Sequence, residues 1–98
     1  MPINFTNAII NKLQREIADI ENNIVNEKNK IKKSQAKIKQ LERDMKLSQS
    51  HSDLSSKMSR INKLNEEIRI YTRSQADLTK QLASKKASLN QHQAKEPQ

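Results

Sequence analysis

The sequence predicts an all-α protein in which two long helices fold back on each other as an antiparallel coiled-coil hairpin. Two observations predict this fold: apolar residues recur at heptad spacing in both halves, and the phase of the repeat changes once, at a polar segment near the middle. The 98 residues include no glycine, no cysteine and only 2 prolines. Tight β-turns, disulfides and thiolate metal sites are therefore not expected.

The first helix is predicted from a seven-residue isoleucine repeat. Every seventh residue from Ile3 to Ile38 is isoleucine, and Met45 continues the row. A second row with Leu13, Ile20 and Leu41 alternates with it in steps of three and four, which is the pattern of a coiled-coil seam. We expect a helix over about 6–47, with Asn4 or Thr6 as its N-cap.

The second helix repeats the pattern in another phase. Leu54 begins the new row nine residues after Met45. At about 100° per residue this moves the apolar stripe to the opposite side of a continuous helix, so we expect the chain to reverse. The polar segment 48–53 is the predicted turn, with Ser52 or Asp53 as a cap. The second helix is expected over about 53–92, followed by a flexible tail at 93–98, and residues 1–98 form a single domain.

The predicted register folds the chain about residue 51. It matches apolar side chains in six layers: Leu13/Leu89, Ile20/Leu82, Ile24/Leu78, Ile31/Tyr71, Ile38/Leu64 and Leu41/Ile61. It also places Glu27 opposite Gln75, a polar pair that would fix the register. The predicted seam comprises Ile10, Leu13, Ile17, Ile20, Ile24, Glu27, Ile31, Ile38, Leu41, Ile61, Leu64, Ile68, Tyr71, Gln75, Leu78, Leu82 and Leu89.

The residue types that catalysis requires are sparse. The two histidines, His51 and His92, are expected at opposite ends of the hairpin, and a chain without glycine has no phosphate-binding loop. We therefore expect no enzyme activity, no catalytic residues, no cofactor and no metal. There is no signal peptide and no transmembrane segment in the sequence, so a cytoplasmic protein is expected, while export by a dedicated secretion system stays open.

Positive charge is concentrated in the middle of the chain. Residues 28–74 contain 13 basic and 5 acidic residues, a net charge of +8, which equals that of the whole chain. In the predicted hairpin this segment forms the half near the turn, and such a basic half could bind nucleic acid, an anionic membrane or an acidic protein. The alternative is a solubilising surface, because these lysines lie outside the seam and few aromatics are available to stack on bases. The candidate polyanion contacts are Lys28, Lys30, Lys32, Lys33, Lys37 and Lys39.

The predicted function is a non-enzymatic protein–protein interaction or scaffold module. Its expected partner is a second copy, which would give a four-helix dimer, or another helical protein. One alternative is non-specific binding of nucleic acid or another polyanion through the basic half. Another alternative follows from the predicted architecture and length: the chain is similar to small helical-hairpin components of bacterial secretion systems, such as type VII substrates and their partners. It has no Trp-x-Gly turn, and Tyr71 is followed four residues later by Gln75 in place of the acidic residue of their export signal.

Overall fold

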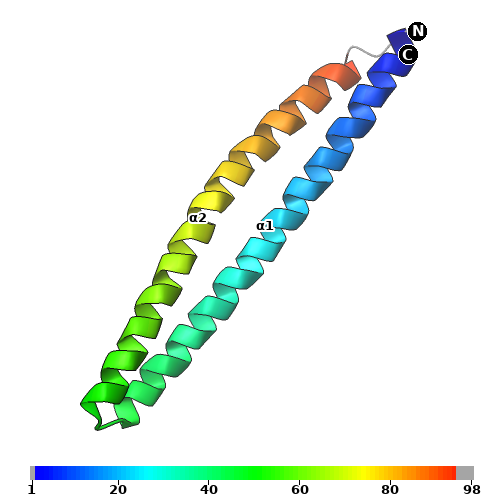
Figure 1. The fold of residues 1–98 in the computed structure, drawn as a ribbon. Helices are drawn as coiled ribbons and strands as arrows, with labels where there is room; N and C mark the ends of the chain where they lie inside the picture. Colours follow the sequence, from blue (N-terminus) through cyan, green and yellow to red (C-terminus); the bar gives the residue numbers. More distant parts are fainter. Residues whose placement is uncertain (1, 95–98) are drawn as a thin grey trace. The chain divides into compact units, whose positions relative to one another are not determined.

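Two helices make up almost all of the structure. The computed structural model describes residues 2–94, with side chains from residue 5 onward. Helix α1 spans Pro2–Leu47 and helix α2 spans His51–Ala94, and no strand occurs between residues 2 and 94. Figure 1 shows the two helices running in opposite directions on either side of the short connection at 48–50. The predicted antiparallel helical hairpin is confirmed.

The helix ends differ from those expected. Helix α1 begins at Pro2, so Asn4 and Thr6 both lie inside it and neither occupies the N-cap position. Proline is compatible with the first helical turn because the backbone N–H that it lacks has no partner there. Helix α2 begins at His51 and continues through Ala94, so residues 93–94 are helical. Residues 95–98 of the predicted tail lie outside the described residues.

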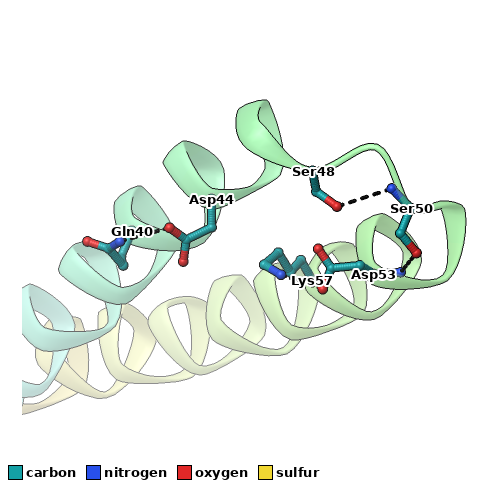
Figure 2. Close-up of polar contacts among 6 residues, drawn as sticks. All are labelled: Gln40, Asp44, Ser48, Ser50, Asp53 and Lys57. Atoms are coloured by element: carbon teal, nitrogen blue, oxygen red, sulfur yellow. Dashed lines mark hydrogen bonds and ion pairs between the residues drawn. The ribbon is translucent and has the colours of Figure 1, made fainter.

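Serine side chains close the connection between the helices. The backbone N–H of Asp53 donates to Ser50 Oγ at 3.3 Å, and the N–H of Ser50 donates to Ser48 Oγ at 3.3 Å (Figure 2). Ser50 is therefore the N-cap of α2, in place of the predicted Ser52 or Asp53, because its hydroxyl satisfies an N–H that has no partner within the helix. None of the described residues has a positive φ, so the turn does not require glycine.

An ion pair supports the first turn of α2. Lys57 lies one turn after Asp53 and donates a hydrogen bond to its Oδ1. This hydrogen bond, and a second one from Ser48, lower the pKa of Asp53. A carboxylate in the first turn also interacts favourably with the positive end of the helix dipole. The side chains that follow the turn therefore stabilise the start of α2.

The hairpin consists of two compact units, which we call the terminal half and the turn half. The terminal half contains residues 1–25 and 75–98, and the turn half contains residues 26–74. The most buried apolar side chains of the terminal half are Ile10, Leu13, Ile17 and Ile20, each 8% exposed. Those of the turn half are Leu41 and Ile61, 5% and 8% exposed. Each half has its own apolar strip between two antiparallel helix segments.

Candidate interaction surfaces

The predicted seam positions lie on the inner sides of the two helices. Six of them are buried: Ile10, Leu13, Ile17, Ile20, Leu41 and Ile61. The others are half-buried: Ile24, Glu27, Ile31, Ile38, Leu64, Ile68, Tyr71, Gln75, Leu78, Leu82 and Leu89. Among the described residues, no large side chain is less than 2% exposed. Two helices form a single layer, and a single layer leaves one side of each inward side chain near water.

The two polar seam residues differ in their hydrogen bonding. The Gln75 side-chain amide donates to the backbone carbonyl of Ile24 at 3.1 Å, which joins the two helices of the terminal half. In the turn half, Glu27 Oε1 is buried and has no hydrogen-bond partner. The side-chain amide of Gln75 thus has a backbone carbonyl as its hydrogen-bond partner. Glu27 instead holds a carboxylate oxygen away from water without compensation, which costs stability.

Ion pairs join the helices of the terminal half. Lys85 Nζ lies 2.7 Å from Glu16 Oε2, and Lys86 Nζ lies 3.7 Å from Glu21 Oε2. The hydrogen bond from Lys85 is the main reason why the pKa of Glu16 is lowered. Both pairs are partly exposed, so each adds little stability by itself. With 6 basic and 5 acidic residues, the segments of this half have a net charge of only +1.

The six candidate lysines do not form one patch. All six are exposed, and helical spacing divides them between two faces of α1. Lys30, Lys33 and Lys37 share one face, with Lys30 Nζ 5.4 Å from the centre of the Tyr71 ring. The other face has Lys28, Lys32 and Lys39. The turn half as a whole has 13 basic and 6 acidic residues, a net charge of +7.

Basic residues of α2 join the first of these faces. An open hollow of about 220 Å³ is lined by Lys37 of α1 and by Arg60, Lys63, Leu64 and Glu67 of α2. The sequence analysis did not single out Arg60 or Lys63. The predicted register could have identified them, because it places Arg60 and Lys63 beside the segment of α1 that follows Lys37.

The other side of the turn half has a mixed, more apolar groove. One hollow of about 530 Å³ is lined in part by Met45, Met58 and Ile61. A second hollow of about 400 Å³ shares Ile38 and other lining residues with the first. Lys39 lines this side, whereas Lys37 lines the other, so the two flanks of the turn half differ in chemistry.

The described residues offer few groups for chemistry. His51 is exposed at the first position of α2, and His92 is half-buried near its end. Between residues 2 and 94 there is no group of three or more histidine, cysteine or acidic side chains placed to hold a metal ion. Over the same residues, neither helix has an apolar stretch long enough to cross a bilayer. Comparisons with family models, curated proteins and solved structures found no match for this chain.

Proposed function

We propose that this protein is a non-enzymatic helical interaction module that completes its core by binding a second copy of itself. The observation that carries the proposal is the incomplete burial of the seam, in which no large described side chain is fully enclosed. Burial of apolar surface is the main force that favours folding and association. A second pair of helices would cover the open side of the single layer.

The surface area of the chain supports the same proposal. The chain exposes 7634 Å². A compact protein of 11.3 kDa is expected to expose roughly 5,700 Å², so the excess is about 1,900 Å². A standard protein interface covers roughly 800 Å² on each partner. The excess is therefore large enough to supply one full interface.

Charge favours the terminal half as the contact. Two turn halves, each with a net charge of +7, would repel each other, whereas the terminal half has a net charge of +1. A dimer joined through the terminal halves does not require the two basic turn halves to contact each other. This arrangement satisfies both the need for burial and the charge distribution.

One flank of the terminal half is suited to close helix packing. The Glu21–Lys86 ion pair marks this flank on both helices. Ala18 lies three residues before Glu21, and Ala83 lies three residues before Lys86, so helical spacing places both alanines on the same side as the ion pair. Both alanines are exposed. Small exposed side chains let a partner helix approach closely beside the ion pair.

Sedimentation equilibrium at micromolar concentration tests this proposal. We expect a dimer with twice the chain mass of 11.3 kDa. Ala83→Glu should weaken the dimer at least tenfold, because it puts a carboxylate into the interface. The matched control is Ser84→Glu, which adds the same charge at the adjacent exposed position facing away from this flank. A helical monomer, or equal effects of the two variants, would contradict the proposal.

A further inference from the structure

We propose that one flank of the turn half binds the phosphate backbone of double-stranded nucleic acid without reading its sequence. The surface is a strip of five cations, which we call the cation strip: Lys30, Lys33 and Lys37 from α1, and Arg60 and Lys63 from α2. It lies in the turn half, whereas the proposed dimer contact lies in the terminal half, so the two proposals stand or fall separately.

The strip is continuous along the flank. On α1 its lysines follow one another at spacings of three and four residues, which places them on one face of the helix. Arg60 and Lys63 extend it from α2, because they line the same hollow as Lys37. Lys30 lies over the Tyr71 ring, and Tyr71 is eleven residues from Arg60 along α2. At about 1.5 Å per residue, the strip is about 17 Å long.

The charges of the strip are available to a ligand. None of the ion pairs found between residues 5 and 94 involves any of its five cations. Glu67 is the single carboxylate that lines the hollow beside Lys37, Arg60 and Lys63. The hollow therefore has a net charge of +2, inside a half whose net charge is +7. Binding a polyanion would neutralise cations that now repel one another.

The chemistry of the strip favours a duplex over other anionic partners. Duplex DNA has one negative charge for about every 1.7 Å of its axis with both strands counted, so about ten phosphates, on all sides of the duplex, lie along the roughly 17 Å of the strip. Single-strand binding relies on aromatic stacking platforms, and Tyr71 is half-buried with Lys30 over its ring. Protein partners bind mainly through a few buried anchors, most often Trp, Tyr or Arg, whereas the hollow is lined by no aromatic residue and its apolar residue is half-buried Leu64. The exposed ammonium groups suit non-directional contacts to phosphates, and the one guanidinium can pair with a phosphate through two N–H groups.

Fluorescence anisotropy with a labelled duplex of about 20 base pairs tests the proposal on the full chain. Because binding would release the counterions of about five phosphates, log Kobs should fall with log salt with a slope of about −4.5. A strip variant carrying Lys37→Gln, Arg60→Gln and Lys63→Gln should bind at least tenfold more weakly at low salt. Its slope should be shallower by about 2.7, because about three contacts are lost.

A charge-matched control separates the strip from net charge. Lys28→Gln, Lys32→Gln and Lys39→Gln remove the same charge from the other face of α1, and we expect this variant to lose less than threefold in affinity. All six residues are exposed, so both variants should keep the helical circular dichroism of the original chain. Equal losses in the two variants would overturn the proposal, because binding would then follow net charge alone.

The choice of partner is tested in the same assay by competition. Unlabelled duplex should displace the labelled duplex at a lower charge concentration than polyglutamate or phosphatidylserine vesicles. Stronger competition by polyglutamate would overturn the proposal in favour of an acidic protein partner, and stronger competition by vesicles would overturn it in favour of a membrane surface. No displacement by unlabelled duplex would show that no duplex site exists.

Discussion

Replacing Glu27 by leucine should make the protein more stable. Glu27 Oε1 is buried in the turn half without a hydrogen-bond partner. A buried polar atom that loses its contacts with water and gains none in the protein costs about 1–3 kcal/mol. Glu27→Leu removes this cost and places an apolar side chain at a half-buried seam position. Mutations at charged positions usually destabilise or have little effect, so a clear gain would be diagnostic.

The expected gain in the free energy of unfolding is about 1 kcal/mol, at the lower end of the cost of a buried unsatisfied polar atom. The lower end applies because the residue is half-buried, so a leucine there gains less than the roughly 1.5–3 kcal/mol of full burial. The assay is guanidinium unfolding followed by circular dichroism, with all variants at one chain concentration because association shifts apparent stability. Glu42→Leu is the control, since Glu42 is exposed on the same helix, and it should change stability by less than about 0.5 kcal/mol. A loss of stability in Glu27→Leu would refute the reasoning.

Three further predictions concern the seam, the cap and an ion pair. Leu41→Ala should lower the free energy of unfolding in denaturant by about 2–3 kcal/mol, because Leu41 is 5% exposed. Leu47→Ala, at a residue 85% exposed, should lower it by less than about 0.5 kcal/mol. Similar losses in the two variants would contradict the assigned burial. Ser50→Ala should lower the free energy of unfolding by about 1 kcal/mol through loss of the cap, and an unchanged unfolding midpoint would show that the cap does not contribute. The hydrogen bond from Lys85 lowers the pKa of Glu16 below 4.5, so the pair contributes stability above pH 4.5 that is lost as the pH falls through the folded-state pKa. Glu16→Gln should therefore flatten the pH dependence of the melting temperature below pH 4.5, and an unaltered acid profile would exclude this contribution.

Much of the fold was predictable because the heptad pattern depends on a simple geometric rule. Isoleucines spaced by seven must lie on one face of a helix, and burying that face requires a second helix. The change of phase after Met45 predicted the reversal for the same reason. The ends of the helices were less predictable. Ser48, Ser50 and Ser52 are all suitable caps by residue type, and only the backbone geometry of the turn selects Ser50.

The candidate surfaces were only partly predictable, because they depend on which side chains the register brings together. The lysines from 28 to 39 are obvious in the sequence, but their division between two faces follows from the helical spacing. The contribution of Arg60 and Lys63 depends on residues distant in sequence. The amide of Gln75 binds a backbone carbonyl, that of Ile24. Backbone acceptors are not visible in a residue pattern.

The central claim is that one chain folds back on itself, since the seam, the grooves and the cation strip all depend on it. The most direct measurement is disulfide cross-linking of a chain carrying Ile24→Cys and Leu78→Cys. Leu78 lies one turn beyond Gln75, whose amide reaches the Ile24 carbonyl at 3.1 Å, and the natural chain has no cysteine. At dilute concentration under oxidising conditions, we predict cross-links within single chains, seen as monomers of increased mobility on non-reducing gels. Covalent dimers with no cross-linked monomer would contradict the claim.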